Sequence, residues 1–122
     1  MIKKVLVVED SPEIGVILTQ MLERMGKDVI TVRDGAIAIA KLEKGRFNLV
    51  IADLLMPGTD GIEVLKAAKR LYPQMPVIIM TSRSNDEMAN EAMELGVLNI
   101  LTKPFSLKEL EISLEKAQQQ SD

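Results

Sequence analysis

The chain has 122 residues, of which 47% are hydrophobic and 27% are charged. This length matches one compact domain, and the composition excludes a disordered chain, a collagen-like repeat and a bare coiled coil. Cysteine and histidine are both absent. Disulfides, thiolate nucleophiles, imidazole bases and metal sites built from these residues are therefore excluded. Any chemistry must use carboxylates, hydroxyls, lysine or the backbone.

The formal net charge is −3 and the isoelectric point is near 5.1. An acidic chain lacks the clustered basic surface that nucleic acids require, so we expect no direct binding to DNA or RNA. No apolar run approaches the roughly 18 residues of a membrane-spanning helix, and the N-terminal apolar run is too short for a signal peptide. We expect a cytoplasmic protein that makes no contact with a membrane.

Short apolar runs rich in β-branched residues recur along the chain and predict five strands. They span residues 5–8, 29–32, 49–51, 77–80 and 97–101. Three of the runs are apolar at consecutive positions, which is typical of strands covered by helices on both faces. This pattern favours a parallel sheet over an antiparallel sheet with one exposed face.

Segments with helical spacing of apolar residues separate these runs. The clearest is residues 14–25, and further patterns cover residues 36–42, 62–71, 88–95 and 107–117. Helix N-caps are predicted at positions 11, 60, 84 and 106, and glycines at positions 26, 45 and 96 are expected to end helices. The tail at residues 117–122, which is polar from position 118 onward, is expected to fray.

The alternation of strands and helices predicts one α/β domain over residues 1–122. Short connections imply right-handed crossovers, and therefore helices on both faces of a doubly wound, five-stranded parallel sheet. The common strand order of such a sheet is 2-1-3-4-5, as in the flavodoxin-like (βα)5 fold. Ligands of this fold bind where the order reverses, at the carboxyl ends of the first and third strands.

Polar side chains follow four of the predicted strands at this edge. They are Glu9 and Asp10 after the first strand, Asp53 after the third, Thr81 and Ser82 after the fourth, and Lys103 after the fifth. Carboxylates about 4 Å apart repel by roughly 4 kcal/mol per pair at an effective dielectric of about 20. One lysine cannot balance three acids, so a hard divalent cation with oxygen ligands is expected. Mg²⁺ fits best because it needs only one or two carboxylates and bridges to phosphate oxygens.

Each of these residues also has an ordinary structural interpretation. A single acid after a strand usually lies in a loop or caps a helix, a threonine or serine there is usually a turn hydroxyl, and a lysine is usually solvated. Pro104 restricts the backbone of Lys103 to an extended conformation and so limits where its side chain projects. The coincidence of polar groups at four strand ends favours a functional site.

A longer pattern extends through these positions. It consists of the acidic pair Glu9-Asp10, the segment Asp53-Leu-Leu-Met-Pro-Gly58 followed by Asp60-Gly61, the pair Thr81-Ser82, and Lys103-Pro104-Phe105. In these residues the chain resembles the receiver domain of two-component response regulators, the CheY-like family, over essentially its full length. The order and spacing across five units make this pattern far more specific than one short motif.

The resemblance implies a phosphoacceptor signalling domain that catalyses only its own phosphorylation and dephosphorylation, and not an enzyme with a separate substrate. It implies that Asp53 accepts the phosphoryl group, that Thr81 contacts the phosphoryl oxygens, and that Lys103 pairs with the phosphorylated carboxylate. A carboxylate can attack phosphorus in line, while positive charge stabilises the equatorial oxygens.

The resemblance also implies a Mg²⁺ site formed by Glu9, Asp10, Asp53 and the backbone carbonyl of Leu55. In such domains the peptide bond that corresponds to Lys103–Pro104 is typically cis. Because the chain has no histidine, a phosphohistidine donor must lie on another protein. The family implies a sensor histidine kinase or phosphotransfer protein as donor and a downstream effector protein or domain as target. We expect a monomer or a weak dimer.

The chain departs from the family at Ile100, where an aromatic residue is usual. An isoleucine cannot make the usual ring flip, so we expect a muted or differently wired switch in which the helix at about residues 86–95 carries more of the change. Leu55 and Arg83 resemble positions that tune the lifetime of the phosphoryl group, and Ser82 and Pro104 belong to the same switch and tuning group. A solvated arginine fits the sequence at position 83 equally well.

Two alternative functions remain open. The first is an interaction scaffold that works without phosphorylation, which Ile100 favours and the complete set of acids opposes. The second is a Mg²⁺-dependent phosphohydrolase with an aspartyl nucleophile. Such enzymes commonly place a second acid two residues after the nucleophile, where this chain has Leu55.

Overall fold

The computed structural model describes residues 1–82 and 87–121, and its elements alternate as the sequence predicts. The strands are β1 (Lys4–Val8), β2 (Asp28–Val32), β3 (Leu49–Asp53), β4 (Val77–Thr81) and β5 (Asn99–Thr102). The helices are α1 (Pro12–Arg24), α2 (Gly35–Lys44), α3 (Gly61–Leu71), α4 (Glu87–Glu94) and α5 (Leu107–Ser121).

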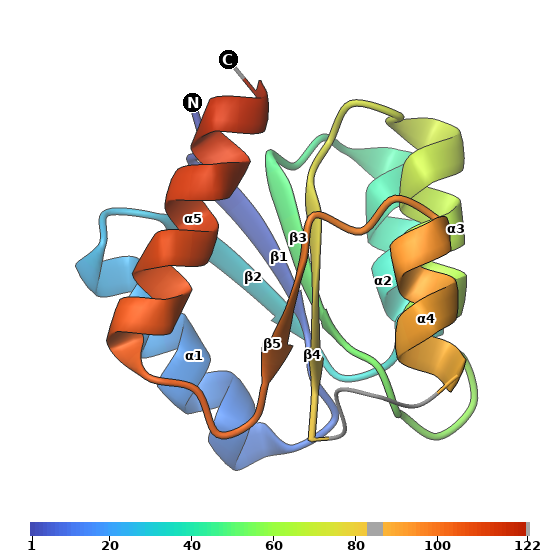
Figure 1. Cartoon of the computed structure of the whole chain (residues 1–122), viewed down its shortest axis with the longest axis horizontal. Helices are drawn as coiled ribbons and strands as arrows, with labels where there is room; N and C mark the ends of the chain where they lie inside the picture. Colours follow the sequence, from blue (N-terminus) through green and yellow to red (C-terminus); the bar gives the residue numbers. More distant parts are fainter. Residues whose placement is uncertain (83–86, 122) are drawn as a thin grey trace.

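The strands form one parallel sheet in the order β2-β1-β3-β4-β5, which confirms the predicted doubly wound topology. Helices α1 and α5 lie on one face of the sheet, and α2, α3 and α4 lie on the other (Figure 1). The order reverses between β1 and β3, which are paired neighbours. Their carboxyl ends therefore open beside a crevice between helices of opposite faces.

Consecutive residues of the central strands point into two separate cores. Leu6 and Val8 of β1 pack with α2, α3 and α4, whereas Val5 and Val7 pack with α1 and α5. Strands β3 and β4 are buried at every position. This explains why their sequences are continuously apolar, since both faces of each strand are withdrawn from water.

Side-chain caps set the starts of the helices close to where the sequence predicts them. The Ser11 hydroxyl accepts from the amide of Ile14, and an Asp60 carboxylate oxygen accepts from the amide of Glu63. Ser106 and Glu109 form a reciprocal capping box, in which each side chain accepts from the other residue's amide at 3.1 Å. Asp34 caps α2 in the same way, accepting from Ile37 at 2.8 Å, although the sequence analysis did not single it out.

The start of β5 differs from the expectation, whereas α4 agrees with it. Strand β5 begins at Asn99 and not at residue 97, because the amide of Val97 donates to the Ala92 carbonyl and closes α4. Helix α4 is described from Glu87 to Glu94, within the expected range of about 86–95. The cap predicted at position 84 lies outside the described residues.

The end of the chain also differs from the expectation. Helix α5 continues to Ser121, four residues beyond the predicted end of its apolar pattern at residue 117. Ala117 is fully buried, and the side-chain oxygen of Gln118 accepts from the amide of Ile2 at 2.7 Å, so this turn is held against the start of β1. In the described part of the chain, no helix is long and apolar enough to cross a bilayer.

Candidate functional site

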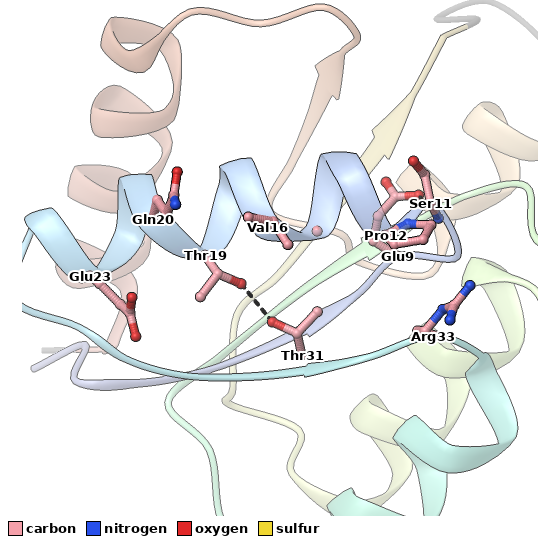
Figure 2. Close-up of a pocket in the computed structure, with 10 residues that line it drawn as sticks. Glu9, Ser11, Pro12, Val16, Thr19, Gln20, Glu23, Thr31 and Arg33 are labelled. Carbon is pink, nitrogen blue, oxygen red and sulfur yellow. Dashed lines mark hydrogen bonds between the residues drawn. The ribbon is translucent and has the colours of Figure 1, made fainter.

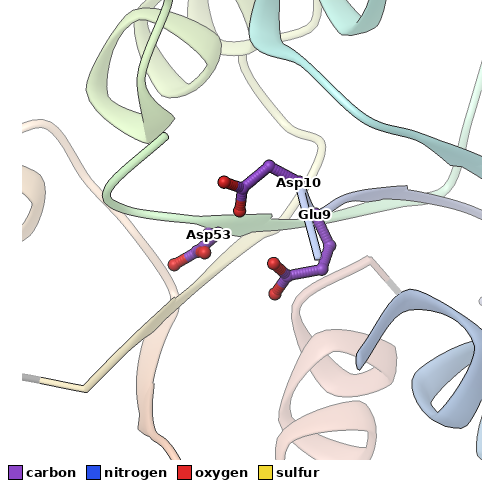
Figure 3. A group of neighbouring side chains, drawn as sticks. All are labelled: Glu9, Asp10 and Asp53. Atoms are coloured by element: carbon purple, nitrogen blue, oxygen red, sulfur yellow. The ribbon is translucent and has the colours of Figure 1, made fainter. Parts of the chain in front are cut away.

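Three carboxylates meet at the carboxyl edge of the sheet, where the strand order reverses. Glu9 and Asp10 follow β1, Asp53 ends β3, and each residue offers a carboxylate oxygen within 4.8 Å of the other two (Figure 3). Only 1% of the surface of Glu9 and 8% of the surface of Asp53 is exposed, and Asp10 is more accessible than either. The predicted convergence of these acids is therefore present in the structure.

Lys103 provides a positive charge at this cluster. Its Nζ donates to Oε1 of Glu9 at 2.7 Å and to Oδ2 of Asp53 at 3.1 Å, and 17% of its side chain is exposed. A solvated surface lysine, the ordinary interpretation, is excluded by these two contacts. Among the residues that the structure describes, one ammonium group facing three carboxylates leaves the site with an excess of negative charge.

The backbone links the strand ends that carry these side chains. The amide of Lys103 donates to the Thr81 carbonyl at 2.7 Å, and the amide of Leu54 donates to the Met80 carbonyl at 2.8 Å. Thr81 is buried at the end of β4 and is paired in register with Thr102. The sheet thus places Thr81, Lys103 and the end of β3 along one edge.

Burial and pairing shift two ionisation equilibria at the site. Burial raises the pKa of the Glu9 carboxyl above its usual value, and the hydrogen bond from Lys103 opposes this shift only in part. Burial alone lowers the pKa of the Lys103 ammonium, but the hydrogen bonds to Glu9 and Asp53, together with the negative charges of these carboxylates, outweigh burial and raise it. The ammonium therefore stays charged throughout the physiological pH range.

The donor set suits a hard divalent cation. Opposite oxygens of a Mg²⁺ octahedron lie about 4.2 Å apart, twice the usual Mg–O distance, so small side-chain movements bring the three carboxylates within reach of one ion. One Glu9 oxygen accepts from Lys103 and the other accepts from the Ser11 amide at 3.0 Å. Asp10 and Asp53 are therefore better placed as direct ligands, and Glu9 is better placed to contribute through water.

The predicted switch and tuning residues are distributed around this site. Ile100 is half-buried on β5 and packs against the core shared by α2, α3 and α4. Ser82 and Leu55 are exposed, and the Lys103–Pro104 peptide bond is cis as expected. The fourth predicted tuning residue, Arg83, lies outside the described residues.

Helix α3 begins in close contact with the end of β3, a feature to which the sequence alone assigns no role. A Cβ atom at Gly61 would overlap the Asp53 carbonyl oxygen and lie 2.9 Å from Cα of Leu54, and the Gly61 amide donates to the Leu54 carbonyl at 3.0 Å. Glycine at this position therefore allows α3 to begin directly against the residue that carries the central carboxylate. In the sequence, the feature that indicates this close approach is a glycine immediately after a helix cap.

A groove of about 500 Å³ runs between α1 and β2 and ends at Glu9 and Ser11 (Figure 2). The Thr19 and Thr31 hydroxyls are hydrogen-bonded across it at 2.6 Å, and the Glu9 carboxylate is bonded to Ser11 and Lys103. Because these polar groups already have partners, we assign no ligand to this groove.

A second groove, of about 400 Å³, lies on the other side of α1. It is lined mainly by apolar side chains of α1 and of the β5–α5 connection, including Ile14, Ile17 and Phe105, and Lys103 lies at its border. Ile17 is 57% exposed, whereas Phe105 is half-buried against the core under α1 and α5. This apolar groove therefore adjoins the carboxylate cluster through Lys103.

Comparison with known proteins identifies the class to which this fold and site belong. The family model of the response regulator receiver domain matches residues 5–115. The chain therefore belongs to the response regulator receiver domain family of two-component systems.

Individual relatives agree with this assignment. The alkaline phosphatase synthesis transcriptional regulatory protein PhoP of Bacillus subtilis is 38% identical over 108 residues, which are 88% of this chain and 45% of PhoP. The chain thus spans less than half of that relative. The chemotaxis protein CheY4 of Vibrio cholerae superposes with a TM-score of 0.88 at 33% identity, covering 96% of this chain and 99% of CheY4. The response regulator protein TrrA of Thermotoga maritima, in complex with Mg²⁺-BeF, has a TM-score of 0.83 at 28% identity, covering 95% of this chain and 99% of TrrA.

Proposed function

We propose that Asp53 accepts a phosphoryl group in a Mg²⁺-dependent reaction and that the resulting aspartyl phosphate controls binding to a partner protein or output domain. The observation that carries this proposal is the meeting of three carboxylates within 4.8 Å beside Lys103. Such an excess of buried negative charge destabilises a fold unless a cation compensates it. Family membership and the Mg²⁺-BeF complex of TrrA support the same interpretation.

The metal site is assigned to residues of the β1 and β3 ends. Asp10, Asp53 and the backbone carbonyl of Leu55 would hold Mg²⁺, with Glu9 contributing through water. When bound, the ion supplies positive charge to the oxygens of the transferring phosphoryl group. By helping to hold this ion, the two acids that follow β1 would allow the Asp53 carboxylate to approach a negatively charged donor.

The transfer itself needs no general base. A carboxylate oxygen of Asp53 attacks phosphorus, the new O–P bond forms, and the N–P bond of a phosphohistidine breaks with its electron pair returning to the imidazole nitrogen. Lys103, already 3.1 Å from Oδ2 of Asp53, stabilises the developing charge on a phosphoryl oxygen. Thr81 contacts a second oxygen and communicates the change to β4 and its surroundings.

A phosphohistidine donor lies outside these 122 residues, since they contain no histidine. We assign the apolar groove between α1 and the β5–α5 connection to an amphipathic helix of a sensor kinase or phosphotransfer protein. Lys103 borders both the groove and the carboxylate cluster, so a helix seated against Ile17 brings its histidine toward Asp53. The exposed apolar area on α1 supplies the contact energy that a transient complex requires.

Intact-protein mass spectrometry tests the assignment of the acceptor. With Mg²⁺ and a small phosphodonor such as phosphoramidate, the wild-type chain should gain one phosphoryl mass, and Asp53→Asn should gain none. The exposed acid Asp28, at the other end of the sheet, provides the matched control, and Asp28→Asn should label normally. Labelling that persists in Asp53→Asn contradicts the assignment.

One observation favours a second candidate, an interaction scaffold that works without phosphorylation. Ile100 cannot change rotamer in the way an aromatic side chain would, and it is packed against the core in this structure. A scaffold of this kind has the same affinity for its partner with and without BeF₃⁻, which mimics the phosphoryl group on Asp53. A difference between the two affinities decides for the phosphorylation switch.

A further inference from the structure

The backbone at the start of α2 lies directly against the loop between β3 and α3, residues 54–60. A Cβ atom at Gly35 would overlap the Thr59 carbonyl oxygen and would lie 2.8 Å from its Cγ2 atom. Gly35 is buried, and its φ lies outside the left-handed region, so an ordinary residue could adopt its backbone conformation. The requirement for glycine at position 35 is therefore one of space and not of conformation.

The β3–α3 loop has further attachments to β4, within the β3–α3 unit and in the core, and the first of these is the bond from the Leu54 amide to the Met80 carbonyl of β4. Gly61 is bonded to the Leu54 carbonyl, Asp60 caps α3, and Met56 is buried in the core shared by α2, α3 and α4. Leu55 lies between these attachments, with 48% of its surface exposed. At Gly35 the start of α2 also packs against Thr59 of this loop. Only residues 33 and 34 separate α2 from the end of β2.

We propose that Gly35 is a positioning residue for the metal site. By allowing α2 to contact Thr59, it holds the β3–α3 loop, and with it the Leu55 carbonyl, at the spacing that a cation bound by Asp10 and Asp53 requires. This inference rests on the proposed function, because it needs the carboxylate cluster to bind Mg²⁺.

The loop, and not the helix, yields when atoms are added at position 35. Helix α2 is fixed by the Asp34 cap and by Ala38 and Leu42, which are both fully buried. The loop contains exposed residues at positions 55, 57 and 58, and Gly58 has a left-handed backbone with φ of 78°. A methyl group at position 35 should therefore displace Thr59, and we expect the loop to transmit this displacement to the Leu55 carbonyl four residues away.

Calorimetric titration of Mg²⁺ into the full chain tests this role. Gly35→Ala should weaken Mg²⁺ binding by about 10-fold or more, the size of effect expected when groups that orient a metal ligand are displaced. Gly45 at the other end of α2 is the matched control, because a Cβ there meets nothing within 4 Å and its φ is −156°. Gly45→Ala should leave the affinity unchanged.

A second control separates positioning from loss of stability. Leu42→Val weakens the packing of α2 seven residues from the contact with Thr59, so it should lower the free energy of unfolding and leave Mg²⁺ affinity unchanged. The proposal is overturned if Gly35→Ala weakens Mg²⁺ binding no more than Leu42→Val does. If Gly35→Ala does not fold, Thr59→Gly decides, since it releases the loop without crowding α2, and unchanged Mg²⁺ affinity in that variant overturns the proposal. Failure of the wild-type chain to bind Mg²⁺ contradicts the proposed function instead.

Discussion

The two ends of the sheet use their polar residues in opposite ways. At the amino end, Asn48 Oδ1 accepts from the amides of Lys3 and Lys4, and the Tyr72 hydroxyl donates to carbonyls at Leu42 and Gly45. These bonds tie the loop before β3 to the start of β1 and the end of α3 to the end of α2. At the carboxyl end, three carboxylates face one lysine, and their charges remain unbalanced.

The two ends of the sheet therefore contribute differently to stability and to reactivity. Satisfied polar groups at the amino end contribute to stability, whereas the crowded acids at the carboxyl end reduce it and make a cation site. The same parallel sheet positions both sets, because every strand runs in the same direction. Removing a bonded polar group at the amino end should therefore destabilise the fold, whereas removing one of the crowded acids at the carboxyl end should stabilise it.

The largest effect is expected for Lys103→Met, which removes the positive charge beside two buried carboxylates. Without Mg²⁺ at neutral pH, the free energy of unfolding should fall by about 3 kcal/mol, because Glu9 and Asp53 are left facing each other. Lys66→Met is the control, since Lys66 is 48% exposed and lies 3.8 Å from each of two glutamates. It should cost about 0.5 kcal/mol or less. Urea denaturation measures both variants. Equal losses of unfolding free energy for Lys103→Met and Lys66→Met would contradict the difference between the buried and the exposed lysine.

A moderate loss is expected at the amino end for Asn48→Ala. Its side chain satisfies two backbone amides, and water can replace only part of that bonding, so the free energy of unfolding should fall by about 1–2 kcal/mol. Asn90→Ala, on the exposed side of α4, serves as the control and should stay within about 0.5 kcal/mol of wild type. A stability equal to that of wild type would show that the amino end is not tied in this way.

A small change of opposite sign is expected for Asp10→Asn. Removing one of three neighbouring carboxylates relieves repulsion, so the metal-free chain should become more stable by about 1 kcal/mol. The same variant should bind Mg²⁺ more weakly. Thermal unfolding in EDTA measures the stability of the metal-free chain, and thermal unfolding in Mg²⁺ without EDTA measures the stabilisation by the ion. Destabilisation of the metal-free variant would refute the idea that the acids are crowded.

The smallest effect concerns pH. Because the folded-state pKa of Glu9 lies above its ordinary value of 4.5, the folded chain binds more protons than the unfolded chain just above that pH. The Glu9 contribution therefore lowers the stability of the metal-free protein as pH rises from about 4.5 through the raised pKa. Glu9→Gln should lack this component, which urea denaturation at a series of pH values will detect. Identical pH profiles would contradict the assigned pKa shift.

The sequence predicts the layout well where one local signal dominates. Continuous apolar runs identify β3 and β4 and the coverage of both faces, and the acids after β1 and β3 mark the site before any distance is known. The start of β5 was placed too early, because the apolar Val97 closes α4 although its side chain suits a strand. The length of α5 was missed because a polar tail gives no sign that Gln118 bonds to Ile2.

Pairings between distant residues could not be predicted from the pattern alone. The sequence places Lys103 at the correct edge of the sheet. Whether its ammonium bonds to Glu9, to Asp53 or to both depends on how far the side chain reaches across the neighbouring strands. The space that requires glycine at position 35 depends on how α2 and the β3–α3 loop approach each other, which no local motif encodes.

The most direct test of the central claim is the dependence of folding stability on Mg²⁺ concentration. An ion that binds the folded carboxylate cluster raises the free energy of unfolding in proportion to the logarithm of its concentration above the dissociation constant. We predict this rise for the wild-type chain and its loss in Asp53→Asn, at constant ionic strength. A wild-type stability that is indifferent to Mg²⁺ would contradict the claim that the carboxyl end of the sheet is a cation-dependent phosphoacceptor site.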